Sequence, residues 1–336
     1  MSKNVKTIIY KSKGDTDPMN KKAQKTAPKQ GFTFIDLFAG IGGMRVGFES
    51  AGGQCVFSSE WDKFAQQTYA ANFGEIPHGD ITQIDVSQIP KHDVLLAGFP
   101  CQPFSHAGLK MGFDDTRGTL FFDVARIIES KKPSLVLLEN VKGFTTHDKG
   151  KTFKTIVEIM EQLGYKVHTK VLNASDFGLP QNRERIFIVC INKRKVKNKE
   201  FSFPKPPKKP TSVGMILEKK VDSKYVLSNK LWAGHQRRLR EHRERGNGFG
   251  YSLFNAKSVR TSTISARYYK DGSEILISTN GNPRKITPRE AARLQGFPDS
   301  FVIPVSDTQA YRQFGNSVAV NVIKAIAKEM RKLLLE

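Results

Sequence analysis

The sequence has little cysteine and no long hydrophobic run. Its 336 residues include only 3 cysteines, and no two of them lie close enough together to suggest a disulfide framework or a zinc knuckle. No apolar stretch approaches the roughly 20 residues that a transmembrane helix needs, and the polar N-terminal segment lacks the apolar core of a secretory signal. We therefore expect a cytoplasmic protein that neither spans a membrane nor binds a metal.

Positive charge is concentrated in two parts of the chain. The formal net charge is +22 at pH 7. Residues 191–285 hold 23 Lys and Arg against 7 Asp and Glu, and residues 1–31 hold 8 Lys against 2 Asp, so the rest of the chain is neutral on balance. A neutral body with a basic insert is typical of an enzyme that binds a polyanion such as nucleic acid. The alternative is a solvated lysine-rich surface.

Hydrophobic periodicity from Phe32 to Ile191 predicts an α/β fold. Short, nearly apolar strands are expected at 33–38, 55–60, 93–99, 135–139, 166–172 and 185–191. Amphipathic helices are expected between them, at 43–51, 62–72, 119–130 and 152–163. This alternation predicts a mostly parallel sheet with helices on both faces, whose ligands bind at the carboxyl ends of the strands.

The composition changes after Ile191. A basic, proline-rich connector at 193–210 leads to residues 211–285, which combine a glycine-rich turn at 245–251 with β-prone runs at 264–269 and 274–278. We expect a small, mostly irregular and β domain there. An amphipathic helix at 318–335 is expected to return to the first domain. The predicted division is a basic flexible leader at 1–31, a first domain of 32–195 and 305–336, and an inserted domain at 196–304.

A glycine-rich turn, FIDLFAGIGG at 34–43, follows the first expected strand. Glycines let backbone amides at a helix N-terminus approach a ligand closely. The pattern is not GxGxxG, which disfavours a nicotinamide cofactor. Glu60 ends the second strand, 20 residues after Gly40, where an acid commonly binds ribose hydroxyls, and Asp80 is expected to end a further strand. These features fit an adenosine site such as that for S-adenosylmethionine. The alternative is a turn that serves packing alone.

Cys101 lies in a polar loop directly after a buried strand, in GFPCQPFS at 98–105. The prolines on either side stiffen this loop. A thiolate suits attack on an electron-poor ring carbon, and a nearby cation or dipole is expected to lower the pKa of the thiol. Cys55 and Cys190 lie in apolar strands, and we interpret them as inert core residues.

Two further motifs carry charged side chains at strand ends. Glu139, in LLENV at 137–141, is a candidate acid with a raised pKa, or alternatively a helix-capping residue. Arg183 and Arg185, in PQNRER at 180–185, could donate to a base carbonyl or a phosphate. Their alternative role is a structural ion pair with Glu184.

Six motifs in this order resemble those of the C5-cytosine DNA methyltransferases of bacterial restriction–modification systems: FIDLFAGIGG, GFPCQPFS, ENV, QNRER, RKITPREAARLQGFPDSF and YRQFGNSVAV. The similarity runs from about Phe32 to the C-terminus, apart from the basic insert. It implies a Rossmann-like methyltransferase fold, in which the first domain is catalytic and the inserted domain recognises the DNA target.

The resemblance also implies residue roles. The pocket for S-adenosylmethionine would be formed by Phe38, Ala39, Gly40, Gly42, Gly43, Glu60, Trp61, Asp80, Ile81, Gly98, Pro100, Leu120, Asn316, Ser317 and Val318. Cys101 would attack C6 of a cytosine extruded from the duplex. Glu139, Arg183 and Arg185 would hold the edge of that base, and no metal would be required.

DNA sequence is expected to be read mainly by Arg260–Gly272, which we call the reading segment. The candidate DNA contacts are Arg260, Thr263, Arg267 and Tyr268 in this segment, and Gln102, Ser105 and Arg117 after the nucleophile. Each arginine could instead contact a phosphate. ARYYKDGSEILI and RGNGFGY resemble the Dcm-type branch of the family, which implies a short palindromic site of CC…GG type.

The expected partner is double-stranded DNA, bound by a monomer in the bacterial cytoplasm in association with the nucleoid. A cognate restriction endonuclease would be a functional rather than a physical partner. Two other classes stay open: an RNA cytosine methyltransferase with the same chemistry, and a non-catalytic DNA-binding regulator. The basic insert argues against the first, and the intact Cys101, Glu139 and glycine turn argue against the second.

Overall fold

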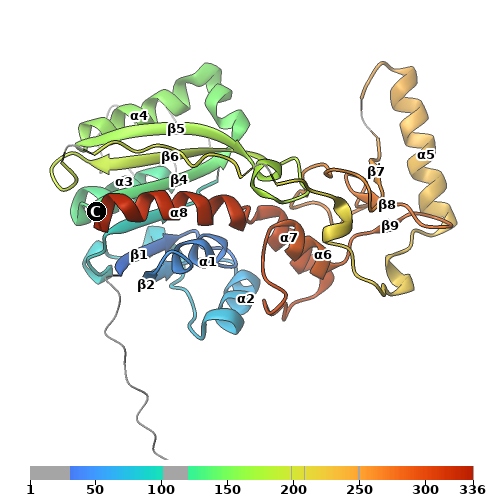
Figure 1. The fold of residues 1–336 in the computed structure, drawn as a ribbon, viewed down its shortest axis with the longest axis horizontal. Coiled ribbons are helices and arrows are strands. Elements are labelled where there is room, and N and C mark those ends of the chain that lie inside the picture. Colours follow the sequence, from blue (N-terminus) through green and yellow to red (C-terminus); the bar gives the residue numbers. More distant parts are fainter. Residues whose placement is uncertain (1–30, 101–119, 198, 208, 249, 336) are drawn as a thin grey trace, which may run out of the picture. The chain divides into compact units, whose positions relative to one another are not determined.

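A computed structural model describes residues 31–100, 120–197, 199–207, 209–248 and 250–335. Its central sheet has six strands in the order β2-β1-β3-β4-β6-β5 (Figure 1). The strands are β1 Phe32–Leu37, β2 Gly53–Ser59, β3 Val94–Ala97, β4 Leu135–Val141, β5 Tyr165–Asn173 and β6 Glu184–Asn192. The first four are parallel, and β6 is antiparallel to both of its neighbours. The predicted mostly parallel sheet is confirmed.

Helices cover both faces of the sheet because successive residues of each strand point to opposite sides. Phe34 and Leu96 belong to a hydrophobic core shared with α1 (Gly43–Glu49) and α8 (Val320–Leu335). Ile35 and Leu95 are the sequence neighbours of Phe34 and Leu96 and point to the opposite face. They belong to a second core with α3 (Leu120–Lys131) and α4 (Lys151–Gln162). The two sets of buried residues hold α3 and α4 on one face and α1 and α8 on the other.

The C-terminal helix α8 returns to the first domain, as its amphipathic pattern predicted (Figure 1). It packs closely on α1, where a Cβ atom at Gly47 would come within 2.3 Å of the Ile323 side chain. Only glycine permits this approach between the two helices. The last residues of the chain thereby fix the helix that follows the glycine-rich turn.

The inserted residues form a small sheet and one long helix. The sheet has the strands β7 Leu253–Phe254, β8 Leu276–Ile277 and β9 Arg284–Lys285. Helix α5 (Asn229–Glu244) lies beyond this small sheet, on the side that is farther from the central sheet β1–β6 (Figure 1). Sequence periodicity did not predict α5. The β-prone run at 264–269 contains no strand, whereas β8 falls within the run at 274–278.

A third hydrophobic core joins the insert to the C-terminal part of the fold. It contains Ile264 and Tyr268 from the insert and residues of α6 (Pro288–Leu294), α7 (Asp307–Asn316) and the start of α8. The domain boundaries at 195/196 and 304/305 stay a prediction. The remaining elements are α2 Lys63–Phe73 and short 3₁₀ helices at Ile81–Gln83, Val86–Gln88, Lys142–Gly150, Ala174–Phe177, Val213–Met215 and Ser223–Tyr225.

Candidate active site

The carboxyl ends of four parallel strands are aligned at one edge of the sheet. The strand register pairs Leu37 with Ser59 on one side and with Ala97 on the other, and Ala97 with Leu138. The residues that follow are therefore brought to the same edge, and they are Phe38, Glu60, Gly98 and Glu139. A cavity of about 890 Å³ opens there, and all four residues line it.

The glycine-rich turn forms one wall of this cavity. Phe38 and Gly40 have positive φ values of 56° and 55°, so the chain turns sharply at the end of β1. The amide of Ala39 donates to the carbonyl of Ser59 (2.9 Å), and the amide of Gly40 donates to Oε2 of Glu60 (2.8 Å). The turn is therefore attached to β2 by main-chain and side-chain bonds.

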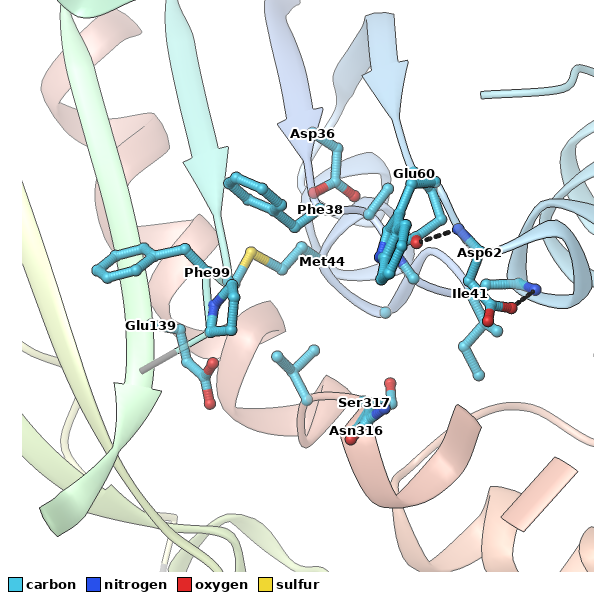
Figure 2. A pocket seen from close by; sticks show the side chains of 18 of the residues that line it. Asp36, Phe38, Ile41, Met44, Glu60, Asp62, Phe99, Glu139, Asn316 and Ser317 are labelled. Carbon is cyan, nitrogen blue, oxygen red and sulfur yellow. Dashed lines mark hydrogen bonds between the residues drawn. The ribbon is translucent and has the colours of Figure 1, made fainter. Parts of the chain in front are cut away.

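Glu60 is a buried carboxylate with fixed geometry. Its Oε1 atom accepts a hydrogen bond from the amide of Asp62 (2.9 Å), in addition to the bond from Gly40. Burial raises the pKa of Glu60, and these backbone hydrogen bonds oppose that shift. Figure 2 shows Glu60 and Asp62 on one side of the cavity and Glu139 on the other, with Phe38 and Met44 between them.

The adjoining wall contains Trp61, Asp80 and Ile81. Trp61 is 76% exposed, so its indole is available to a ligand. The expectation that Asp80 ends a third strand is wrong: the backbone near it makes only an isolated bridge between Ser59 and His78. Asp80 instead caps a 3₁₀ helix by accepting from the amide of Thr82 (3.0 Å).

The far wall comes from the C-terminal part of the chain. Asn316, Ser317 and Val318 line the cavity, and Figure 2 shows Asn316 and Ser317 across it from Phe38. A Cβ atom at Gly43 would lie 2.8 Å from Ser317 Oγ, which shows how closely the two segments approach. Most of the expected cofactor residues thus surround one cavity: Phe38, Ala39, Gly40, Gly43, Glu60, Trp61, Asp80, Ile81, Gly98, Pro100, Leu120, Asn316, Ser317 and Val318.

Gly42 was expected to contact the cofactor, but it does not line the cavity. Its φ of +83° ends the turn at the N-terminus of α1, and a Cβ atom there would lie 2.2 Å from the Phe73 ring. Phe73 belongs to α2, so Gly42 allows α2 to pack against the turn. The close packing of Phe73 explains why position 42 requires glycine. A contact between Gly42 and the cofactor stays a prediction.

Glu139 and Arg185 form an ion pair at the opposite end of the cavity. Arg185 Nε lies 3.2 Å from Glu139 Oε1, and both side chains are largely buried. Burial raises the pKa of Glu139, and the nearby Arg185 and Arg183 partly oppose this shift. Neither arginine makes a side-chain ion pair with Glu184, whose carboxylate binds Lys142 instead (2.9 Å). The alternative of a structural pair with Glu184 is therefore not what the structure shows.

Arg183 has a different environment from Arg185. Its Nη1 donates to the carbonyl of Ile264 (3.2 Å), and its Nη2 donates to the carbonyls of Gly315 (3.0 Å) and Ser317 (2.6 Å). Burial lowers its pKa to about 9. We expected Arg183 to hold the cytosine edge. It lines the same cavity as Glu139, and its terminal nitrogens are engaged by main-chain carbonyls from two other parts of the chain.

Asn140 holds the described residues that precede the predicted nucleophile in sequence. The Asn140 side-chain amide donates to the carbonyl of Phe99 (3.0 Å) and so connects the end of β4 to the segment that enters the Cys101 loop. Pro100, the preceding residue, lines the cavity. Cys101, Gln102, Ser105 and Arg117 lie outside the described residues.

Comparison with known proteins identifies the family. The sequence model described as C-5 cytosine-specific DNA methylase matches residues 32–332. The chain belongs to this family. It is a DNA cytosine-5 methyltransferase, and the motif resemblance is confirmed at the level of the family.

Curated relatives cover most of the methyltransferase chain. It is 63% identical to the type II methyltransferase M1.ScrFI of Lactococcus lactis subsp. cremoris, over 90% of this chain and 79% of that protein. It is 64% identical to M.NlaX of Neisseria lactamica, over 90% of this chain and 97% of that protein. Identity to the DNA-cytosine methyltransferase of Escherichia coli K12 is 45%, over 90% and 78%.

Solved structures of lower identity support the fold of the methyltransferase. The Entamoeba histolytica methyltransferase EhMeth matches with a TM-score of 0.74 at 20% identity, and covers 92% of this chain and 100% of its own. A Spodoptera frugiperda DNMT2 mutant matches with a TM-score of 0.73 at 23% identity, over 91% and 100%. Both likenesses concern the fold alone.

The candidate DNA contacts of the methyltransferase differ in their exposure. Arg267 is exposed, and Arg260 donates to Ser175 Oγ (3.2 Å) at the surface. The Thr263 hydroxyl donates to the carbonyl of Asn182. Tyr268 is fully buried, and its hydroxyl donates to Ile275 O (2.7 Å) and accepts from Ile286 N (2.9 Å). Tyr268 is therefore a core residue, and its side chain offers no free group to DNA.

Asp36 is the main site residue that sequence reasoning missed. It lies in the first motif, lines the cavity and is only 1% exposed, and its Oδ2 atom has no hydrogen-bond partner. Burial raises its pKa to about 7. Other lining residues of the methyltransferase are also adjacent to the motifs: Ile41, Met44, Asp62, Phe99, Asn140, Arg312 and Gln313. Inclusion of whole motifs would have found most of them.

Of the two other cysteines, Cys190 is a core residue as expected, whereas Cys55 is only partly buried and packs against the core; their expected inertness stays a prediction. Cys190 is buried, and burial raises the pKa of its thiol. Burial also raises the pKa of Cys55, to about 12. Across the part of the chain that the structure describes, no three His, Cys, Asp or Glu side chains are grouped to hold a metal ion. No helix in that part is long and apolar enough to cross a membrane.

Proposed function

We propose that this methyltransferase uses S-adenosylmethionine to methylate C5 of one cytosine within a specific short sequence of duplex DNA. Its membership of the cytosine-5 methylase family supports the reaction, and the type II methyltransferases at 60–64% identity support a place in a restriction–modification system. The single observation that carries the proposal is the shared cavity, which contains both the Gly40–Glu60 pair and the Glu139–Arg185 pair.

The residues of the cavity fit an adenosine derivative with a positive charge. Glu60 and Asp80 supply carboxylates for hydroxyl or amino groups, and Phe38 and Trp61 supply aromatic surface for a purine. Among the described residues that line the cavity there is no lysine to bind a phosphate. The buried Asp36 carboxyl, with one oxygen unpartnered, offers an acceptor. When bound, S-adenosylmethionine supplies an electrophilic methyl group.

The chemistry of cytosine explains the need for a nucleophile and an acid. C5 of cytosine is too weak a nucleophile to be methylated unaided. We propose that the Cys101 thiolate adds to C6 while Glu139 donates a proton to N3, which makes C5 an enamine carbon. After methylation, water accepts the C5 proton, the Cys101 thiolate leaves C6, and N3 returns its proton to Glu139, which restores the neutral aromatic ring. Arg185 holds Glu139 in place for the proton transfer.

The target base must leave the duplex for this chemistry. C6 is inaccessible in a stacked helix, so the cytosine is extruded at a cost of about a few kcal/mol. Basic residues of the insert would bind the phosphates, and the reading segment would contact base edges in a site of CC…GG type. Arg267 is an exposed side chain of the reading segment and is available for such a contact.

Two experiments test the proposed function. Bisulfite sequencing of DNA from cells that express the chain should reveal 5-methylcytosine at one short sequence. Duplex DNA with 5-fluorocytosine at that position should form a denaturant-resistant adduct, because fluorine cannot leave as a proton does. The Cys101→Ser variant should form no adduct and retain cofactor binding. The proposal is wrong if the purified wild-type protein methylates no cytosine in any DNA.

A further inference from the structure

The first half of the reading segment is bonded to the Pro180–Arg185 segment. The amide of Asn182 donates to the carbonyl of Thr261 (2.9 Å), and the amide of Thr261 donates to the carbonyl of Pro180 (2.8 Å). The amide of Ile264 donates to Oε1 of Gln181 (3.1 Å). These residues are about 80 positions apart in sequence, yet their backbones run side by side as a short parallel bridge.

The other side of the reading segment lies against the C-terminal end of α7. A Cβ atom at Gly315 would come within 2.3 Å of the carbonyl carbon and oxygen of Ser265, and within 2.4 Å of the amide of Ala266. Real Cβ atoms do not approach backbone this closely, so any side chain at this position would displace the segment. Ser265 and Ala266 therefore lie directly against the end of α7, although Ser265 is itself an exposed residue.

Arg183 joins the reading segment to the wall of the cavity. Its guanidinium binds the Ile264 carbonyl on one side and the carbonyls of Gly315 and Ser317 on the other. Ser317 itself lines the cavity. Two residues after Arg183, near the start of β6, Arg185 contacts Glu139. One short segment thus touches the reading segment, the cofactor wall and the catalytic carboxylate.

The buried charge of Arg183 makes these contacts act together. Its side chain is nearly inaccessible, and its Nε has no hydrogen-bond partner. A buried guanidinium that loses a carbonyl partner is left with an unsatisfied donor, which is costly in a low-dielectric interior. When Ile264 is displaced, the Arg183 side chain is therefore expected to move with it and to shift Ser317, because this keeps the guanidinium hydrogen-bonded.

We propose that Arg183 is a positioning residue that couples the seating of the reading segment on DNA to the cofactor wall and to Glu139. It acts through Ile264, Gly315 and Ser317 and does not touch the cytosine. Correct DNA contacts then favour the arrangement that is competent for methyl transfer. This inference rests on the proposed function, and it assigns to an arginine of the catalytic motif the role of a link between two sites.

The test compares Arg183→Lys with a matched control. Lysine keeps the charge but cannot span three carbonyls, because it lacks the planar fork of arginine. Arg289 on α6 also binds main-chain carbonyls, those of Pro298 (3.5 Å) and Phe301 (2.7 Å), and neither residue belongs to the reading segment or the cavity. Arg289→Lys therefore removes the same kind of bond without breaking the proposed link.

Two quantities are measured for each protein. The first is the affinity for S-adenosylhomocysteine with and without a duplex that carries the site mapped by bisulfite sequencing. The second is the single-turnover rate on that duplex relative to one with a substituted base pair elsewhere in the site. Coupling between sites is commonly about 5- to 150-fold in affinity. We expect DNA to change the affinity for S-adenosylhomocysteine by the same factor in the wild-type protein and in Arg289→Lys.

In Arg183→Lys, DNA should no longer improve the affinity for S-adenosylhomocysteine. The ratio of single-turnover rates on the correct and the substituted duplex should fall by about 10-fold or more, which corresponds to the cost of one mismatched base pair. Affinity for S-adenosylhomocysteine without DNA should stay within about threefold of wild type. Gly315→Ala provides a second variant that displaces Ser265 without removing a charge, and it should reduce coupling in the same direction. Thermal unfolding of each variant confirms that it is folded.

Two results would overturn the inference. If Arg183→Lys loses turnover while coupling and discrimination match wild type, Arg183 acts on the cytosine directly. If Arg289→Lys shows the same losses, the effect is one of general stability. A wild-type enzyme that transfers no methyl group would instead contradict the proposed function, and the inference would be rejected with it.

Discussion

Arg185 lies 3.2 Å from Glu139 because of the register between β4 and β6. Strand pairing places Arg185 opposite Val141 and Glu139 opposite Phe187, so Arg185 and Glu139 are diagonal neighbours on the same face of the sheet. Long side chains reach across such diagonals. The pair is therefore set by the backbone of two buried strands rather than by a loop, and it is positioned before any substrate arrives.

This pair yields a prediction for Glu139 as the proposed catalytic acid. Glu139→Gln should lower the single-turnover rate of methyl transfer by about 10²- to 10⁴-fold, because an amide cannot donate a proton to N3. The raised pKa of Glu139 implies that the wild-type rate declines as pH rises through that pKa, and the variant should lack this decline. Rapid-quench measurements from pH 5.5 to 9 check both points.

Glu184→Gln is the control for this prediction. Glu184 precedes Arg185 on the same strand, and its side chain forms an exposed ion pair with Lys142. Exposed pairs contribute little to stability, so this variant should keep the wild-type rate within about twofold. An equal loss in both variants would show that the effect is not specific to the acid.

The sequence predicted the sheet and the cavity better than it predicted the side-chain partners. Strand and helix positions follow from local periodicity, and the motif residues follow strands whose carboxyl ends share one edge. Glu60 and Glu139 could therefore be placed from sequence. The carbonyl partners of Arg183 could not, because Ile264 and Gly315 are about 80 and 130 residues away in sequence, and hydrogen bonds to main chain leave no signal in side-chain composition.

Two errors in the insert have physical causes. Helix α5 is polar on most of its surface, and only its inner side, with His235 and the Trp232–Tyr251 contact, packs on the insert. Its hydrophobic period was too weak to detect. Tyr268 was a candidate DNA contact as part of the Arg260–Gly272 segment, but its ring packs edge-on against Tyr311, at 4.9 Å between ring centroids. Local charge did not reveal this long-range core contact.

Gly42 provides a test of the packing between the glycine turn and α2. Gly42→Ala should lower the free energy of unfolding by about 1–3 kcal/mol, because the added Cβ atom meets the Phe73 ring and overpacks the site. Gly52→Ala is the control: its φ of +88° is similar, but no atom lies within 4 Å of the added carbon. Denaturant unfolding of both separates the steric clash from backbone strain. A Phe73→Leu change should partly rescue Gly42→Ala, and the prediction is wrong if it does not.

Asp36 predicts a pH dependence of stability. The folded protein holds a proton on Asp36 up to about pH 7, whereas an unperturbed aspartate loses it near 3.8. The contribution of this group to stability is therefore full below about pH 4, decreases as the pH rises towards 7, and is lost above that value. The charged groups that act on it are Arg45, Glu49 and Glu60.

The Asp36→Asn variant isolates this contribution. It cannot release a proton, so its melting temperature should decrease less between pH 5 and pH 8 than that of the wild-type protein. Asp176 is an exposed aspartate, and Asp176→Asn should reproduce the wild-type pH dependence. Calorimetry of the three proteins at several pH values provides the comparison. Equal slopes in all three would show that Asp36 does not titrate in this range.

Helix α5 predicts how the enzyme binds the DNA backbone. Arg240 and Arg243 are exposed and lie three residues apart on one side of the helix, whereas Arg238 is paired with Asp271. Exposed arginines in a basic insert suit phosphate contacts, which supply affinity without sequence information. Replacing either residue with Gln should weaken DNA binding at low salt and reduce the slope of log affinity against log salt by about 1.

The methylated sequence should not change in these variants, because phosphate contacts do not read bases. Lys154, an exposed lysine on α4 that pairs with Glu158, is outside the insert, and Lys154→Gln should leave the salt slope at the wild-type value. Filter-binding titrations at four salt concentrations, with bisulfite sequencing of the products, measure both quantities. A changed recognition sequence in Arg240→Gln or Arg243→Gln would mean that α5 reaches base edges, and DNA reading would then extend beyond the Arg260–Gly272 segment.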